Sequence, residues 1–368
     1  MTKREAEILE LIRENPMISQ QEIAKRLSIT RSSVGVHIKN LVEKGAIRGR
    51  GYLINDKDSI VVVGGANMDL RGFSMGPIRL EDSNPGTLSQ SGGGVGRNIG
   101  ENLARLGFSV DVITALGDDV FGRALQNDAP TGLSFRKSIV FPGATTPVYL
   151  EVLDDEKNMV VAISDMALVD RLDMERLSGL LPTMRHARAG VLDTNLPEKT
   201  IAGLLRHVPI PWLIDGVSGA KVLKLRGHLQ GVGALKINRL EAEVLLERKL
   251  PKEKDVKLAL EELYEQGVGH VIITLGGDGV MGYDGKKMVG LEAEDVKVKN
   301  ATGAGDAFAA GFWAAHLRGE DFEEALKFGR AASSMALLSE ETNPKEMDFE
   351  TLKKCSCTVK KQATENKR

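Results

Sequence analysis

Residues 300–308, with the sequence Asn-Ala-Thr-Gly-Ala-Gly-Asp-Ala-Phe, place a glycine-broken turn and a carboxylate at the start of an apolar helical stretch. The unpaired amide N–H groups in a helix's first turn carry partial positive charge, so this turn suits an anion. Gly303 and Gly305 have no side chains to keep an anion from those amides. Asp306 could accept a proton from a hydroxyl beside the anion. The pattern suits phosphoryl transfer to an alcohol; the simpler alternative is a turn whose aspartate caps a helix.

Length, charge and cysteine content restrict the class of protein. The 368 residues are enough for two domains, and 42% of them are hydrophobic, which allows a sizeable core. A net charge of −2 points to neither a nucleic-acid nor a membrane partner for the whole chain. The only cysteines, Cys355 and Cys357, allow no disulfide framework and predict a cytoplasmic protein. No apolar run reaches the roughly 20 residues that cross a membrane, and the charged start MTKREAEILE is not typical of a signal peptide.

Residues 1–55 differ from the rest in charge and pattern. They hold ten Lys or Arg against six Asp or Glu. Apolar spacing, with Ser19 and Thr30 as caps, predicts three short helices, and residues 46–54 alternate around glycines like a small β-wing. This layout resembles the winged helix-turn-helix domains of bacterial regulators. Charge and topology favour DNA binding, and a basic oligomerisation or docking domain is the alternative.

The same resemblance implies which residues of this head would contact DNA. Side chains early in the third helix would face a groove, and arginines of the wing would meet phosphates. These residues are Arg31, Ser32, Ser33, His37, Lys39, Arg48 and Arg50.

From residue 60 the pattern changes to alternating strands and helices. Buried runs such as IVVV (60–63) alternate with helical stretches such as RNIGENLARLG (97–107). The alternation predicts an α/β domain with a mostly parallel sheet covered on both faces, and ligands at the carboxyl ends of its strands. Hairpin-like pieces at approximately 69–91 and 145–163 do not fit this core and predict a small lid. The polar tail, 353–368, is predicted to be disordered.

A second glycine cluster, GGGVGRN at 92–98, ends in an asparagine that can donate to and accept from a hydroxyl. Its match to the dinucleotide pattern GxGxxG is weak, because no acidic residue follows in the expected context about 20 positions later. Together with residues 300–308, it resembles the two signatures of the ribokinase (PfkB-type) carbohydrate kinase family. The motifs KINRLEAE (236–243) and TLGGDG (274–279) lie between them in family order.

This resemblance implies a ribokinase-like three-layer sandwich at 60–350 with a small β lid, preceded by a winged-helix domain at 1–55. It implies ATP and Mg²⁺ as cofactors, with Asp306 as base and an anion hole formed by the amides of Gly303, Ala304 and Gly305. Residues implied in binding the substrate are Asn67, Asp69, Gly93, Gly94, Asn98 and Asp306. Residues implied in binding ATP are Asn238, Thr274, Gly276, Gly279, Gly303 and Gly305, with Glu241 positioning Mg²⁺ through water.

Several stretches are similar to the pseudouridine kinase branch of the family, among them residues 83–107, 164–170 and 339–344. Asn300 stands where the family usually has an aspartate that helps to hold a monovalent cation, but asparagine is usual in this branch, so cation activation is open. The implied reaction is ATP-dependent phosphorylation of the 5′-hydroxyl of pseudouridine. Adenosine, inosine, ribose or a hexose phosphate are alternative acceptors, and a DNA-binding regulator with a kinase-like sensor domain is an alternative function.

Other polar residues are weaker candidates. On the lid strands, Thr146, Tyr149 and Asp165 could meet the base, or they could be ordinary strand residues. Near the ends of core strands, the candidates for contacts to substrate or nucleotide are Asp193, Asn195, Ser218 and Lys221. The family resemblance also implies a homodimer formed through the lids.

Overall fold

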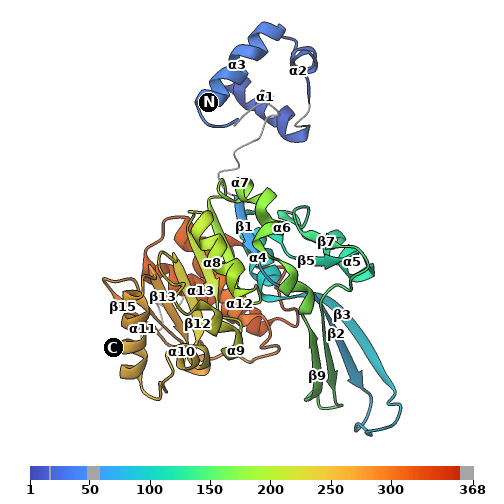
Figure 1. Ribbon diagram of the computed structural model, residues 1–368, viewed down its shortest axis with the longest axis vertical. Helices are drawn as coiled ribbons and strands as arrows, with labels where there is room; N and C mark the ends of the chain where they lie inside the picture. Colours follow the sequence, from blue (N-terminus) through green and yellow to red (C-terminus); the bar gives the residue numbers. More distant parts are fainter. Residues whose placement is uncertain (16–17, 48–58, 357–368) are drawn as a thin grey trace. The chain divides into compact units, whose positions relative to one another are not determined.

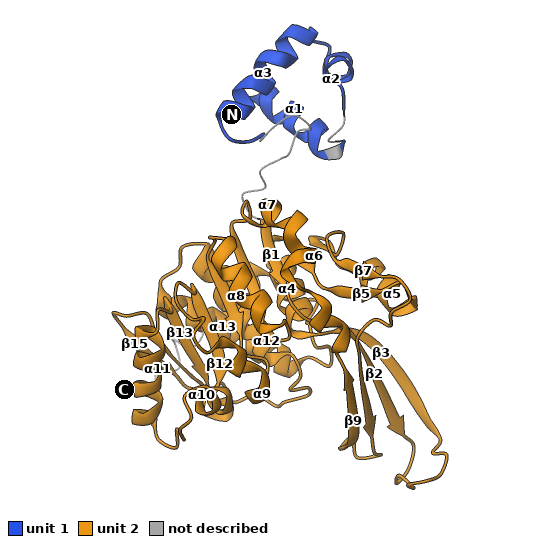
Figure 2. Ribbon diagram, viewed as in Figure 1, with its two compact units in different colours: residues 1–58 blue, residues 59–368 orange. Residues whose placement is uncertain are grey.

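The computed structural model describes residues 1–15, 18–47 and 59–356 (Figure 1). The chain divides into two compact units, residues 1–58 and residues 59–368 (Figure 2). Separate clusters of buried apolar side chains form the core of each unit. Each unit thus has the independent core that defines a domain.

Three helices form the described part of the first unit: α1 (Lys3–Glu14), α2 (Gln20–Arg26) and α3 (Arg31–Glu43). Each begins after a side chain that accepts a hydrogen bond from an amide of its first turn, namely Thr2, Ser19 and Thr30. Such caps satisfy N–H groups that the helix itself leaves unpaired. The fully buried side chains where the three helices meet include Ile8, Ile12, Ile23, Val34 and Leu41.

Within residues 59–356, nine strands of the second unit form the main sheet, in the order β15-β14-β13-β12-β11-β10-β1-β4-β6. The strands from β13 to β6 run parallel, and β14 and β15 are antiparallel to their neighbours. Their bounds are β1 (Ser59–Val63), β4 (Ser109–Ile113), β6 (Leu133–Ser134), β10 (Ala189–Asp193), β11 (Trp212–Asp215), β12 (Ala234–Asn238), β13 (His270–Thr274), β14 (Val280–Tyr283) and β15 (Met288–Leu291). The prediction of a mostly parallel sheet is confirmed.

Helices cover both faces of this sheet. One face packs against α4 (Val95–Arg105), α12 (Ala304–Leu317) and α13 (Phe322–Leu338). The other packs against α8 (Glu198–His207), α10 (Arg239–Leu245) and α11 (Glu253–Glu265). Successive residues of β1 belong to the two cores in turn, as the alternation of side chains along a strand requires. The predicted three-layer α/β sandwich is confirmed.

Shorter elements connect these layers. The helical ones are α5 (Val120–Asn127), α6 (Met174–Leu177), α7 (Leu181–Met184), α9 (Gly219–Val222) and the 3₁₀ turns η1 (Ala167–Arg171), η2 (Ser178–Leu180), η3 (Leu223–Leu225) and η4 (Gly276–Asp278). Two short parallel strands pair beside the main sheet, β5 (Ala115–Gly117) and β7 (Ile139–Phe141).

The two hairpin-like segments form a separate four-stranded sheet, the lid, which extends from the body of the domain in Figure 1. Its order is β3-β2-β8-β9, with bounds β2 (Asn67–Ser74), β3 (Gly86–Gly93), β8 (Val148–Leu153) and β9 (Met159–Asp165). The strands β2 and β8 run parallel although they are far apart in sequence. The lid predicted from the sequence therefore exists, and β3 leads directly into α4.

Two helices of small residues position the turn at residues 300–306. A Cβ on Gly311 of α12 would lie 2.7 Å from the Cβ of Ala332 of α13, and a Cβ on Gly329 would lie 2.9 Å from the ring of Phe308. Because neither glycine has a Cβ, the backbones of α12 and α13 can approach closely. This close packing of α12 against α13 fixes the position of the turn that precedes α12.

Part of the predicted disordered tail is ordered. Residues 349–356 are helical, and Leu352 and Ser356 are buried, so residues 353–356 do not belong to a disordered tail. The mostly polar sequence there favours disorder, but burial of Leu352 anchors one face of the helix to the domain. The remainder of the tail, with Cys357, lies outside the described residues.

Candidate active site

The turn before α12 has the geometry of an anion site. Gly303 is the N-cap of the helix with φ of +81°, a left-handed conformation that favours glycine. A Cβ at this position would also lie 2.5 Å from Cγ2 of Thr342. No described side chain caps α12, so the amide N–H groups of its first turn are left for a ligand. These amides belong to Ala304, Gly305 and Asp306.

Asp306 lies in the first turn of α12 and is almost fully buried. The Nδ2 of Asn98, on α4, donates a hydrogen bond to its Oδ2 over 2.9 Å. Burial, followed by the negative charge of Asp215, raises the pKa of Asp306 to about 7. A carboxylate with a pKa near neutral is suited to act as a general base at physiological pH.

Lys236 is a buried cation beside this carboxylate, and the motif analysis assigned it no role. Its Nζ donates to Oδ2 of Asp215 over 2.9 Å, and the two side chains are 8% and 3% exposed. Burial alone would lower the pKa of Lys236, but the charges of Asp215, Glu241 and Asp306 raise it above its usual value. A Cβ on Gly305 would lie 2.9 Å from Nζ. The ammonium group is therefore charged and directed toward the anion turn.

A sequence signal for this pair existed. Lys236 interrupts the buried strand ALKIN, and Asp215 ends the buried strand WLID. Charged residues are almost never fully buried unless they are paired. A charged residue on a buried strand therefore indicates that an oppositely charged partner lies beside it. Which partner it has depends on the neighbouring strands β11 and β12.

The residues predicted to hold sugar hydroxyls meet at the base of the lid. Asn67 donates through Nδ2 to Oδ1 of Asp69 over 2.5 Å, and both side chains are buried. A Cβ on Gly93 would lie 2.3 Å from the carboxylate of Asp69, and Gly94 has φ of +97°. Burial raises the pKa of Asp69. The segment from Gly93 to Asn98 connects the two carboxylates, because Gly93 lies against Asp69 and Asn98 donates a hydrogen bond to Asp306.

A cavity of about 630 Å³ lies beside the anion turn. Three predicted nucleotide-binding residues, Thr274, Gly276 and Gly279, line it together with Gly305. Its walls include the apolar side chains Val296, Val298, Phe308 and Leu337. An apolar slot that ends at an anion turn suits a purine base with its phosphates.

Glu241 and Asn238 form a reciprocal cap on α10 and do not line this cavity. Asn238 donates to Glu241 through its backbone N–H over 2.8 Å and through Nδ2 over 2.6 Å, and accepts from the Glu241 amide over 2.9 Å. A Cβ on Gly216 would lie 2.7 Å from Oε2 of Glu241, so this carboxylate lies near the end of β11. Among residues 1–15, 18–47 and 59–356 no cluster of three metal-ligating side chains exists.

The loop after α13, residues 339–344, is joined to α4 through Asn343. Asn343 donates to Oδ1 of Asn98 over 3.1 Å and accepts from Asn102 over 3.0 Å. This amide network orients the Nδ2 of Asn98 toward Asp306. No local pattern in SEETNP indicates that Asn343 contacts α4.

Asn300 does not offer a cation the ligands that an aspartate would. Its Oδ1 accepts from the Thr302 amide over 2.9 Å, and its Nδ2 donates to the carbonyl of Glu340 over 3.3 Å. The side chain is neutral, and one of its hydrogens already joins the two loops. The Asn300 side chain therefore offers a monovalent cation a weaker ligand than an aspartate would.

Two of the weaker candidates, Thr146 and Asp193, have positions that argue against ligand contact. Thr146 is completely buried; its hydroxyl donates to Asp119 over 2.6 Å and accepts from the Gly117 amide over 2.9 Å. It supports the turn before α5, and its interpretation as a substrate contact is wrong because no donor hydrogen is left. Asp193 is likewise buried, with Oδ2 accepting from the amides of Gly65 and Gly96 over 2.8 and 2.7 Å.

Asn195 and Lys221 bond to each other over 2.6 Å. Ser218 precedes α9 and makes no side-chain cap to it. Asp165 is exposed at the end of β9, whereas Tyr149 is half-buried on β8. Of these five residues, only Tyr149 pairs across the lid with a predicted substrate residue, Asp69.

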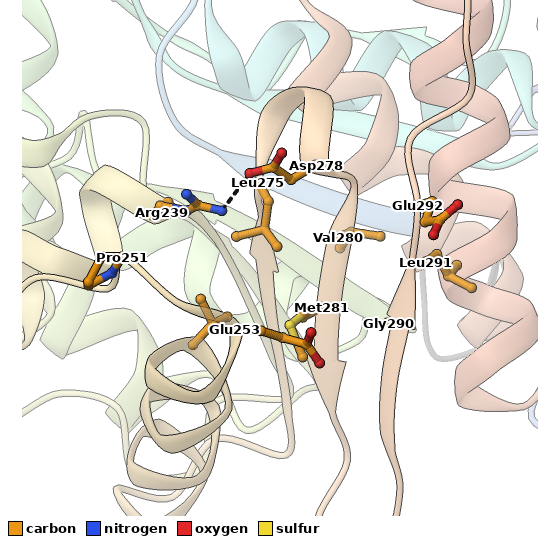
Figure 3. A pocket seen from close by; sticks show the side chains of 11 residues that line it. Arg239, Pro251, Glu253, Leu275, Asp278, Val280, Met281, Gly290, Leu291 and Glu292 are labelled. Carbon is orange, nitrogen blue, oxygen red and sulfur yellow. Dashed lines mark hydrogen bonds and ion pairs between the residues drawn. The ribbon is translucent and has the colours of Figure 1, made fainter.

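A second hollow, of about 410 Å³, lies between η4 and α11 (Figure 3). Arg239 donates to Oδ2 of Asp278 over 2.8 Å across it. Asp278 belongs to the same turn as Gly276 and Gly279, which line the larger cavity. The turn at residues 276–279 thus separates the two hollows, and this one contains none of the residues around Asp306.

The candidate DNA face lies on α3. Arg31, Ser32 and Lys39 are exposed, and Ser33 and His37 are half-buried. Both serine hydroxyls contact Oγ1 of Thr30, over 2.9 and 2.8 Å. The predicted wing lies outside the described residues from residue 48 onward, together with Arg48 and Arg50.

The fold and the site are those of a kinase, and comparison with known families agrees. The family model described as pfkB family carbohydrate kinase matches residues 57–348, and the model described as winged helix-turn-helix DNA-binding matches residues 1–48. The chain belongs to the pfkB family of carbohydrate kinases and carries an N-terminal winged helix-turn-helix domain. It is a phosphotransferase that acts on a hydroxyl group.

Two relatives from Escherichia coli K12 are similar over most of their length. An uncharacterised sugar kinase, YeiI, is 34% identical over 347 residues, which are 93% of this chain and 96% of the relative. A pseudouridine kinase is 36% identical over 293 residues, 79% of this chain and 94% of the relative. The structure of Arabidopsis thaliana ribokinase with ribose and ATP has a TM-score of 0.72 at 21% identity, over 82% of this chain and 99% of that one, which shows the ribokinase-like fold. No helix among the described residues is long and apolar enough to span a membrane.

Proposed function

We propose that this kinase transfers the γ-phosphoryl group of ATP to the 5′-hydroxyl of pseudouridine. The observation that carries the transfer chemistry is the convergence of Asp306, the ammonium of Lys236 and the first-turn amides of α12. The acceptor is supported by the 36% identity to a pseudouridine kinase and by Asn300 in the second signature. We propose the cytoplasm as the place of this reaction, because ATP is available there.

Each group in the proposed site has a defined part. Asp69, held by Asn67, accepts hydrogen bonds from ribose hydroxyls and leaves the 5′-hydroxyl directed toward Asp306. Asp306 takes the proton of that hydroxyl, and Asn98 orients the carboxylate. Lys236 and the α12 amides balance charge on the transferred phosphoryl group. Glu241 would hold Mg²⁺ through water, and the ion would neutralise negative charge on the phosphates.

An acceptor panel tests the proposal. Purified protein with ATP and Mg²⁺ is assayed for ADP release with pseudouridine, uridine, adenosine, inosine, ribose and fructose 6-phosphate. We expect the highest kcat/KM with pseudouridine. We also expect the same rate after potassium is replaced by a large organic cation, because Asn300 joins its two loops by a hydrogen bond without an ion. Equal or better turnover of another acceptor would assign the enzyme to that substrate instead.

A second role, DNA binding by the first unit, is supported by the match to a DNA-binding winged helix and by the exposed Arg31 and Lys39 on α3. We expect Arg31→Ala to weaken binding about tenfold, since it removes a contact at the start of α3. The measurement is a mobility shift against duplexes selected from a random pool, over a range of salt concentrations.

The matched control for this experiment is Arg4→Ala, which removes the same charge from α1, where Arg4 pairs with Glu7. It should leave DNA binding nearly unchanged. If wild-type protein retains no DNA at low salt and the first unit self-associates, the docking alternative is correct.

We further propose that the enzyme is a homodimer formed through the lids. The lid face opposite Asp69 exposes apolar side chains, with Leu88 85% and Ile163 60% exposed. An apolar face of this kind is stabilised when a second copy covers it. Leu88→Glu should shift the molar mass in sedimentation velocity to that of a monomer, and Leu258→Glu, on the exposed side of α11, should not. A monomeric wild-type protein would contradict the proposal.

A further inference from the structure

The lid has two chemically different faces, which follow from its strand register. Residues paired across neighbouring strands share a face, and so do alternate residues along one strand. Asp69 pairs with Tyr149, and Arg71 with Glu151. The outer positions beside these two pairs are Ser89, Ser91, Ser164 and Ala162, which are small and mostly polar. Because Asp69 belongs to this polar face, it is the face that covers the proposed substrate site.

Arg71 and Glu151 form an ion pair on that face. Nε of Arg71 donates to Oε2 of Glu151 over 2.9 Å, and the side chains are 20% and 17% exposed. Arg71 follows Asp69 by two residues, about 7 Å along the strand. If Asp69 holds the ribose of a nucleoside, the attached base extends over a distance of this order, as far as Arg71. The pair presents guanidinium donors and a carboxylate acceptor side by side, and within the described residues no hydrogen bond uses the Nη atoms of Arg71.

The chemistry of the proposed substrate matches this arrangement. In pseudouridine the uracil ring is joined to ribose through C5, so the edge opposite the sugar carries N1–H, C2=O and N3–H. In uridine the ring is joined through N1, and the same edge carries C5–H, C4=O and N3–H. The two nucleosides therefore differ there by one donor, N1–H, which a carboxylate can recognise.

We propose that Glu151 accepts a hydrogen bond from N1–H of pseudouridine while Arg71 donates to the adjacent C2=O. This inference rests on the proposed function and assigns the choice between pseudouridine and uridine to one side chain of the lid. A partly buried acceptor disfavours a ligand that lacks the matching donor, because one of its oxygens then loses a hydrogen bond that it makes to water in the free enzyme. The sugar contacts at Asp69 are common to both nucleosides.

The test compares kcat/KM for pseudouridine, N1-methylpseudouridine and uridine in wild-type protein, Glu151→Ala and Arg71→Ala. Wild-type protein should prefer pseudouridine to both analogues by about tenfold to a hundredfold. Uridine controls for the bulk of the added methyl group. In Glu151→Ala this preference should fall to within about threefold of unity, because the acceptor of N1–H is gone.

Arg71→Ala is the matched control, since it breaks the same ion pair. It should lower kcat/KM for all three nucleosides while keeping the preference for pseudouridine, because each presents a carbonyl in the middle of its edge. If the two variants have the same effect, or if Glu151→Ala keeps the wild-type preference, the pair only supports the lid and the inference is wrong. Failure of wild-type protein to phosphorylate pseudouridine would instead overturn the proposed function itself.

Discussion

Replacement of Asp306 by asparagine is expected to lower kcat by about a hundredfold to ten-thousandfold, the usual contribution of a general base. Asparagine keeps the shape of the side chain and can still accept the hydrogen bond from Asn98. Binding of ATP, measured by calorimetry, should therefore change little. Substantial remaining turnover would remove Asp306 from the role of base.

The pH dependence provides an independent readout of the same residue. Because burial raises the pKa of Asp306 to about 7, the carboxylate is largely protonated below that pH and cannot accept a proton. The value of kcat/KM should rise with pH and reach half its maximum near pH 7 in the wild-type enzyme. This limb should be absent from the residual activity of Asp306→Asn.

Stability should change in the opposite direction to activity. The folded state holds the proton of Asp306 more tightly than the unfolded chain, so stability falls as pH rises from about 4 to about 7, and the loss is complete above it. Asp306→Asn removes this cost, which is on the order of 4 kcal/mol at most, and should raise Tm at pH 8. Asp321→Asn is a matched control, because Asp321 caps α13 in an exposed turn and asparagine caps equally well.

Replacement of Lys236 by methionine is expected to have the second large effect, a loss of about a hundredfold to a thousandfold in kcat. The ammonium lies against the anion turn among three carboxylates, Asp215, Glu241 and Asp306. Without it, no described cation of this cluster balances the charge of a transferred phosphoryl group. The expected loss in kcat is of the size seen when a single oxyanion-stabilising donor is removed. Steady-state kinetics with saturating ATP would measure the loss.

The single variant also leaves Asp215 buried without its ion-pair partner, which commonly costs about 3–5 kcal/mol and could prevent folding. The double variant Lys236→Met/Asp215→Asn separates the two effects. It should regain much of the thermal stability without regaining turnover. Recovery of turnover in the double variant would show that Lys236 only neutralises Asp215.

Lys224→Met controls for the general cost of losing a partly buried lysine. Lys224 donates to the carbonyls of Thr194, Asn195 and Leu196, away from the anion turn. This variant should lose stability and keep kcat. A comparable loss of kcat would mean that the effect of Lys236→Met reports structural damage.

The sequence by itself determined the local features of this protein. Alternation of buried runs and helical stretches predicted the layered α/β domain, and the glycine turn at residues 300–306 predicted where α12 begins. Caps such as Thr30 placed the helices of the first unit. These features depend on residues within a few positions of each other, where backbone geometry leaves few choices.

Only the tertiary structure decided which groups meet. Asn98 and Asp306 are 208 positions apart, and their contact depends on the packing of α4 beside α12. The pairing of Lys236 with Asp215 and of Arg71 with Glu151 depends on which strands are neighbours and in what register. Thr146 was assigned to the substrate from its place on the lid, whereas its hydroxyl is used by Asp119. Strand order and register bring distant charges together, and burial of those charges, which no local pattern specifies, raises the pKa of Asp306.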